Sequence, residues 1–217
     1  ASLDHIDAAW RAMADYAGHD GPFRYLLLLD DLGGVDVQPA VRVAYEAALH
    51  AVPLTGVSFG LPHSTTDIRW AGLASAGRWL IKDLGDEYRP DNPGLSKDLK
   101  YLLGICAKAP ERPDILTRVR TDLVAALGTA GVLLLPTAPQ IAFSHDGNAP
   151  ANQADFTGLA NIAGLPAIAI PAGWSDDGLP VSVQFIGPAG SELRLIALAR
   201  TVDAALQAYR PPATFGF

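Results

Sequence analysis

The sequence is poor in cysteine, has no long apolar run and carries no excess of positive charge. Its single cysteine, Cys106, excludes an internal disulfide and gives no support for a metal site. No apolar run approaches the length of a membrane span, and residues 1–10 lack the basic-then-apolar layout of a signal peptide. The formal net charge of −7 argues against nucleic acid or an anionic membrane as the main partner. We therefore expect a cytoplasmic protein without a membrane or nucleic-acid partner.

Signatures of several kinds of ligand site are missing as well. The sequence contains no phosphate-binding glycine loop and no dinucleotide fingerprint. Its five histidines include no pair at metal-ligand spacing. Two carboxylate pairs, at residues 30–31 and 176–177, stand in turn contexts where solvated charge is the default. The sequence thus predicts neither a cofactor nor a metal.

What is present is an alternation of strand and helix patterns. Apolar runs at 23–29 and 54–61 flank a helix that begins at Pro39, which predicts a parallel crossover unit. The continuous apolar run 132–135 is typical of a strand buried on both faces. The runs 167–170 and 181–185 flank a Ser-Asp-Asp-Gly turn and predict a hairpin. We expect an α/β fold with a mixed β-sheet flanked by helices on both faces.

Capping residues predict the remaining helices. Ser2 should begin a helix with an apolar face that extends to Ala17, and Ser64 with Asp67 should begin one that extends to about residue 80. Further helices are expected at 95–107, from Pro113 to a stop at Gly128, from Asp155 to a stop at Gly164, and after Ser191. Cys106, in the first of these, is expected to be an unreactive thiol in the core. Residues 83–94 are dense in charge, proline and glycine, and are expected to form a mobile loop.

A set of short motifs follows in order through the second half of the chain. They are the Pro-Thr-Ala-Pro turn at 136–139 with Ala-Phe at 142–143, then Phe156-Thr157, Asn161, Gly-Leu-Pro-Ala at 164–167, Pro-Ala-Gly at 171–173, Gly-Leu-Pro at 178–180 and Gln184. In this order and spacing they resemble the C-terminal half of the amidase signature family, the serine amidases that include the glutaminase subunit of tRNA-dependent amidotransferases. The resemblance is strongest at 117–205 and implies that residues 1–217 form the C-terminal portion of a single amidase-like domain.

The resemblance implies that the catalytic residues lie in another segment of the amidase. The family uses a serine nucleophile, a second serine that relays protons and a lysine base, in a segment rich in glycine and serine. None of the four lysines, at 82, 97, 100 and 108, precedes such a segment. We therefore expect no catalytic residue here, and a role as scaffold and pocket wall for a small-molecule amide once an N-terminal half completes the fold. A half-domain of this kind should also expose apolar surface that favours self-association.

The same resemblance places the substrate pocket at four residues. Phe143 and Phe156 would supply apolar walls, with Thr157 beside them. Asn161 would be either a polar anchor or a lock on the turn between the helix and the next strand. These four residues are the substrate-binding residues that the sequence predicts.

Two positions bear on the choice of substrate. Glutaminase members carry an aspartate where this chain has Ala154, and Asp155 comes one residue late. Because neighbouring helical positions differ by about 100° of rotation, Asp155 is expected to point elsewhere and to cap the helix. No arginine matches the one that would hold a glutamine carboxylate. A charged zwitterion needs both partners in a desolvated pocket, so the sequence favours a general amidase over a tRNA-dependent glutaminase.

Two other functions stay open. The segment 56–60, Gly-Val-Ser-Phe-Gly, matches a nucleophile elbow, and Ser58 would then be a serine hydrolase nucleophile with His145 and Asp122 as partners. The alternation of Val57 and Phe59, with Pro62 after them, instead favours an ordinary strand serine. The other alternative is a non-catalytic binding or assembly module derived from an amidase.

Overall fold

The computed structural model describes residues 2–14, 21–89, 91–144 and 146–211. Its strands form one five-stranded sheet in the order β2-β1-β3-β5-β4. The strands are β1 (Tyr25–Leu29), β2 (Thr55–Phe59), β3 (Gly131–Pro136), β4 (Ala167–Trp174) and β5 (Pro180–Ile186). β1 pairs in parallel with β2 and β3, whereas β5 is antiparallel to β3 and β4. The mixed sheet, the parallel crossover and the hairpin that the sequence predicted are all confirmed.

Burial differs sharply along the sheet. Every residue of β3 is buried, as the continuous apolar run predicted. At one end of the sheet, β2 is exposed along nearly its whole length. At the other end, β4 carries a register shift between Pro171 and Gly173 where it pairs with β5. The hydrophobic core therefore centres on β1, β3 and β5.

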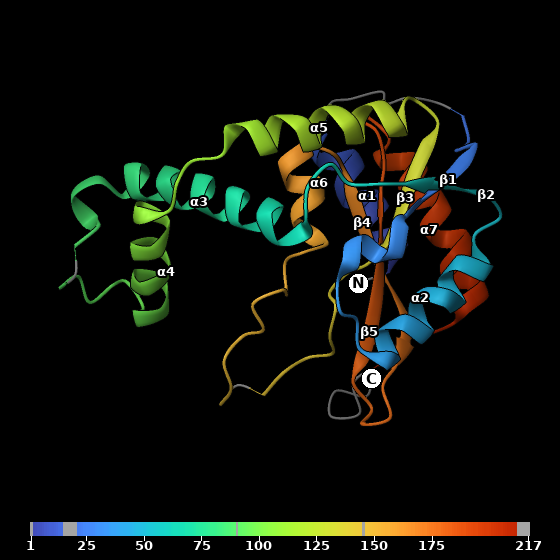
Figure 1. Ribbon diagram of the computed structural model, residues 1–217. Helices are drawn as coiled ribbons and strands as arrows, with labels where there is room; N and C mark the ends of the chain where they lie inside the picture. The colour runs from blue at the N-terminus through green and yellow to red at the C-terminus, as the bar shows by residue number, and fades with distance from the viewer. Residues whose placement is uncertain (1, 15–20, 90, 145, 212–217) are drawn as a thin grey trace.

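Helices cover both faces of the sheet, as expected. They are α1 (Leu3–Met13), α2 (Pro39–Ala51), α3 (Thr65–Leu84), α4 (Lys97–Lys108), α5 (Pro113–Leu127), α6 (Thr157–Ala163) and α7 (Glu192–Leu206), with short 3-10 turns η1 (Asp30–Gly34) and η2 (Gly85–Glu87). In Figure 1, α2 and α7 lie on one side of the strands, and α5 and α6 on the other. Within the ranges described, none of the helices is both long and apolar enough to cross a membrane.

Most helix ends follow the predicted capping residues. The Ser2 and Ser64 side chains accept hydrogen bonds from the first turns of α1 and α3. Gly164 ends α6 in the left-handed conformation, at φ 67°. Ser191 stands at the start of α7 but makes no capping bond. Its buried hydroxyl lies close to Gly187, just after β5, and has no hydrogen-bond partner among the described residues.

Two expected boundaries differ in the structure. The helix α1 ends at Met13, and Ala17 lies outside the described residues. α3 continues to Leu84 and is followed by η2, so the segment 83–94 begins in helix rather than in a loop. α3 packs against α4 through Gly77, a contact that charge and proline content cannot reveal.

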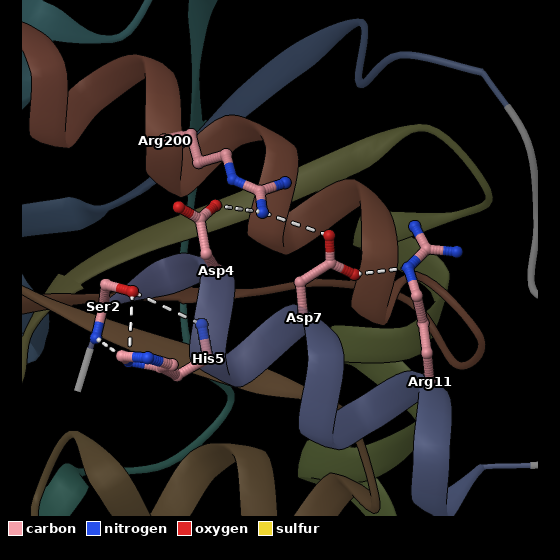
Figure 2. A network of polar contacts seen from close by, with 6 residues as sticks. All are labelled: Ser2, Asp4, His5, Asp7, Arg11 and Arg200. Atoms are coloured by element: carbon pink, nitrogen blue, oxygen red, sulfur yellow. Dashed lines mark hydrogen bonds and ion pairs between the residues drawn. The ribbon is translucent and has the colours of Figure 1, made fainter.

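Ion pairs with α7 and the partly buried Leu3 attach the first helix to the rest of the fold. Figure 2 shows Arg200 of α7 between Asp4 and Asp7 of α1, with Nη2 to oxygen distances of 2.7 and 3.1 Å, and Arg11 on the other oxygen of Asp7. Hydrogen bonds from Arg11 and then Arg200 hold the pKa of Asp7 below its usual value. No residue of α1 is buried. Because exposed ion pairs contribute little, α1 is a weakly attached outer layer.

α3 and α4 form an arm that projects from the sheet (Figure 1). The two helices are in close contact because Gly77 of α3 lies against Cys106 of α4. The Cys106 thiol is buried and donates to the Leu73 carbonyl oxygen at 3.3 Å. Burial raises the pKa of this thiol, which keeps it in the unreactive protonated form and agrees with the inert thiol expected from the sequence.

This contact yields a first prediction. A methyl group at Gly77 would lie 2.4 Å from the Cys106 Cβ atom, so Gly77→Ala must separate the arm's two helices. We expect a loss of about 1–3 kcal/mol in the free energy of unfolding, measured by urea denaturation. Gly104→Ala in α4 is the matched control, because its added methyl meets nothing within 4 Å and should stabilise by up to about 1 kcal/mol. Equal effects of the two substitutions would contradict the close packing of the arm.

Candidate functional site

The largest concentration of predicted site residues is at the start of α6. Thr157 and Asn161 are one helical turn apart on this helix and face the same pocket, which has a volume of about 430 Å³. α3 and α5 form its other walls. Its lining residues are Arg69, Gly72, Leu73, Ser75, Ala76, Leu116, Ala154, Thr157, Gly158, Asn161 and Ile162. We call this space the α3–α6 pocket.

The structure separates the two predicted phenylalanines from this pocket. Phe156 is completely buried, with 0% of its surface exposed, and belongs to the hydrophobic core beneath α6. Phe143 is 39% exposed and lines a second hollow of about 180 Å³. Of the four predicted residues, the structure therefore brings Thr157 and Asn161 together and places the aromatic side chains elsewhere.

The second hollow lies beside the Pro-Thr-Ala-Pro turn. Besides Phe143, it is lined by Thr137, Gln140 and Ser182. The hydroxyl of Thr137 and both polar atoms of the Gln140 amide are buried without a hydrogen-bond partner among the described residues. A buried polar group without a hydrogen bond destabilises the folded protein. The Pro-Thr-Ala-Pro turn therefore has polar groups that still lack hydrogen-bond partners.

Asp155 does not cap α6, contrary to expectation. The N-cap position belongs to Phe156, and no side chain bonds to the first turn of the helix. Instead, Arg69 of α3 donates from Nη1 to the Asp155 carboxylate, and the two side chains are only 8% and 4% exposed. A carboxylate this deeply buried needs a cationic partner, which outweighs the gain from capping a short helix.

The arginine was not anticipated from the sequence. Arg69 lies 86 residues before its partner, and nothing in the local pattern of α3 distinguishes it from a solvated helical arginine. A signal was present only on the other side of the pair. An aspartate immediately before the buried Phe156 is an acidic group in an apolar setting, which predicts a cationic partner somewhere in the fold.

Asn161 also has a defined role in the helix. Its side-chain amide nitrogen donates to the Thr157 carbonyl oxygen at 3.3 Å, one turn back along α6. The residue remains exposed at the pocket mouth. This bond lies within the helix, whereas the following turn is closed by backbone bonds and by Gly164. Asn161 therefore lines the α3–α6 pocket while its amide nitrogen is bonded within the helix.

Ser58 is an ordinary strand serine, as the alternation around it indicated. It lies in β2 opposite Leu28 of β1, and its hydroxyl donates to the Asp30 carboxylate. β2 ends at Phe59, and the next helix begins only at Thr65, so the sharp turn from strand to helix of a nucleophile elbow is missing from this segment. Asp122 pairs with Arg118 on α5 at 2.8 Å, and His145 lies outside the described residues.

No metal site is evident in the part of the chain that the structure describes, where no three His, Cys, Asp or Glu side chains gather. The side chains that line the α3–α6 pocket offer hydrogen bonds and one positive charge. One nearly buried guanidinium is accompanied by hydroxyl and amide groups and by apolar side chains. In a pocket of this kind, the few polar groups of the lining fix the orientation of a bound small molecule.

Comparisons with known proteins bear on both the sequence and the fold. Residues 102–196 match the family model described as Amidase. A solved amidase has a similar fold, with a TM-score of 0.71 and 20% identity, over 94% of this chain and 51% of that one. A bacterial aryl acylamidase of the amidase signature enzymes family gives a TM-score of 0.63 and 20% identity, over 88% of this chain and 47% of that one. Residues 102–196 match the Amidase family, and the described chain shares the fold of these amidase signature enzymes.

The curated relatives match less than half of the chain. One glutamyl-tRNA(Gln) amidotransferase subunit, from Prochlorococcus marinus strain MIT 9313, is 43% identical over 90 residues, 39% of this chain and 18% of that protein. The corresponding protein from Deinococcus radiodurans is 40% identical over 94 residues, 40% and 20% of the two chains. The matched part of this chain spans about a fifth of the length of these relatives, and the structural match spans about half of the solved amidases.

Proposed function

We propose that this chain forms the substrate-side half of an amidase, a hydrolase of carbon-nitrogen bonds in amides. In this proposal the serine, second serine and lysine that perform the covalent chemistry come from a segment outside these 217 residues. The observation that carries the proposal is the family match over residues 102–196, a range that contains Thr157 and Asn161, the two predicted residues that line the pocket. The span of about half of the solved amidases supports the division between two segments.

The proposed roles follow from the geometry of the α3–α6 pocket. The acyl part of the amide would lie against Leu116 and Ile162, with its polar groups toward Thr157 and Asn161. The external serine oxygen would bond to the amide carbonyl carbon, and its proton would pass through the second serine to the lysine. The carbon-nitrogen bond would then break, the amine would leave with that proton, and water would release the acid from the serine.

A general amide is the substrate that we propose, in preference to glutamine bound for transfer to tRNA. Ala154, at the position of the glutaminase aspartate, lines the pocket with a methyl group and offers no charge to an amino group. The neighbouring Asp155 is committed to Arg69 and does not line the pocket. The pocket therefore lacks, among its described residues, an anion that could hold the ammonium group of an amino acid.

The proposal predicts activity only in the completed protein. The chain alone should release no ammonia from simple amides and should not react with a fluorophosphonate probe, which labels activated serines. Joined to or mixed with an amidase segment that carries the lysine and the two serines, it should hydrolyse amides, and the probe should label the added segment. The measurement is ammonia release together with mass spectrometry of the labelled peptide.

Two outcomes would contradict this assignment. Labelling of the chain alone that Ser58→Ala abolishes would make it a serine hydrolase of its own. Tight assembly with the added segment, but without hydrolysis of any amide offered, would instead favour a binding or assembly module. Dimers or larger species of the isolated chain, detected by light scattering and dispersed by that segment, would agree with the proposed half-domain.

A further inference from the structure

The α3–α6 pocket contains one charged side chain, and that side chain is almost completely buried. Arg69 is 9% exposed overall, yet it lines the pocket. At about 430 Å³, the pocket lies within the usual range for small-molecule sites. Arginine is rarely so buried unless its N–H groups are satisfied, so the bonds of this guanidinium decide what the pocket can hold.

Only part of the guanidinium is in use. It carries five N–H donors, and among the described residues it makes one hydrogen bond, from Nη1 to Asp155. That contact leaves the edge formed by Nε and Nη2, which is the edge that binds a carboxylate through two parallel hydrogen bonds. Asp155 is bonded to Arg69 but is not itself a lining residue of the pocket. The aspartate is thus a positioning residue for the arginine.

The rest of the pocket fits the remainder of a small acid. Ser75 and Thr157 add hydroxyl groups, and Leu73, Leu116 and Ile162 add apolar surface. The described residues that line it include no second ionisable side chain. A ligand with a short aliphatic chain and one carboxylate would therefore meet complementary groups throughout, whereas an ammonium group would meet only the guanidinium.

We propose that the α3–α6 pocket binds a carboxylate through the Nε–Nη2 edge of Arg69, so that the preferred substrates are amides that carry a carboxylate, such as half-amides of dicarboxylic acids. That the bound acid is a substrate rests on the proposed function. The binding itself does not, because the arginine, its positioning aspartate and the pocket lining all belong to this chain.

The test compares two probes that differ only in the charged group. Succinamate carries a carboxylate where succinamide carries a second amide. We expect the full chain to bind succinamate with a dissociation constant about tenfold or more below that for succinamide, because hydrogen bonds to a charged group are the stronger kind. Isothermal titration gives the two constants. In NMR titrations, the backbone amide signals of Thr157 and Asn161 should shift. Equal constants, or shifts confined to other elements, would overturn the proposal.

A pair of double substitutions assigns the preference to Arg69. Arg69→Met with Asp155→Leu removes both charges and should bring the ratio of the two constants to about one. Arg112→Met with Asp114→Leu makes the same change at an exposed pair and should leave the ratio as it is. If the first double variant does not fold, Arg69→Lys keeps the charge without the fork and should reduce the ratio several-fold. If the ratio of the two dissociation constants is unchanged by these substitutions at Arg69, the arginine is not the group that binds the carboxylate.

The failure of this inference can be told from failure of the proposed function. If the chain binds succinamate through Arg69 but the completed protein hydrolyses no amide, the pocket assignment stands and the amidase proposal fails. If the completed protein hydrolyses succinamide and succinamate equally well, and the Arg69 and Asp155 double variant does the same, the amidase proposal stands and the carboxylate site is wrong.

Discussion

Replacing Arg69 alone with methionine should lower the free energy of unfolding by about 3–5 kcal/mol. The substitution leaves the Asp155 carboxylate, 4% exposed, without its partner in the protein interior. An unpaired buried charge is strongly destabilising because no water replaces the lost hydrogen bonds. Urea denaturation followed by circular dichroism should show a large fall in the midpoint with a nearly unchanged slope.

Two controls separate the missing partner from lost packing. Arg69→Met with Asp155→Leu removes both charges and should recover most of the stability, because apolar residues of similar volume often replace a buried ion pair without loss. Arg112→Met, at an exposed pair, should change the free energy of unfolding by about 0.5 kcal/mol or less. A single Arg69→Met variant with the wild-type midpoint would mean that Asp155 is not confined as the structure places it.

Phe156→Ala should cost a similar amount, about 3–5 kcal/mol. The phenylalanine ring is entirely buried in the hydrophobic core, so its removal creates a cavity. For a chain of this size, the loss corresponds to a fall of roughly 6–20 °C in the unfolding temperature. Differential scanning calorimetry measures it directly.

The comparison with Phe143 tests whether either ring is a substrate wall. Phe143 is 39% exposed, so Phe143→Ala should cost about 1 kcal/mol or less. In the completed enzyme, kcat/KM for small and bulky amides should keep its ranking in Phe156→Ala at temperatures where the variant is folded. A variant that stays stable but changes this ranking would show that Phe156 faces the substrate and not the core.

Local patterns in the sequence predicted most of the fold. The apolar run of β3, Pro39 at the start of α2 and Gly164 at the end of α6 each encode their structure within a few residues. The serine in β2 was correctly placed for the same reason, since alternation of side chains is a local property. Where a segment contains its own capping residue, hydrophobic periodicity and terminating residue, its sequence is sufficient to predict its secondary structure.

The candidate site depends on pairings that local patterns do not contain. Asp155 looks like a helix cap until Arg69, brought near by the packing of α3 against α6, is placed beside it. Thr157 and Asn161 could be expected on one helix face, but which helices oppose them could not. The motif order pointed to α6, whereas the charged side chain in the α3–α6 pocket comes from α3, where no motif was recognised.

The two margins of the sheet differ in their ability to accept another strand. β4 ends the sheet with a proline, which has no N–H to offer, and with a register shift that disturbs regular pairing. β2 ends it with five residues, Thr-Gly-Val-Ser-Phe, that include no proline and no charge. Lateral growth of this sheet is therefore directional. An added strand, whether from the same polypeptide or from a neighbouring copy, would extend the order beyond β2 and enclose side chains that β2 now presents to water.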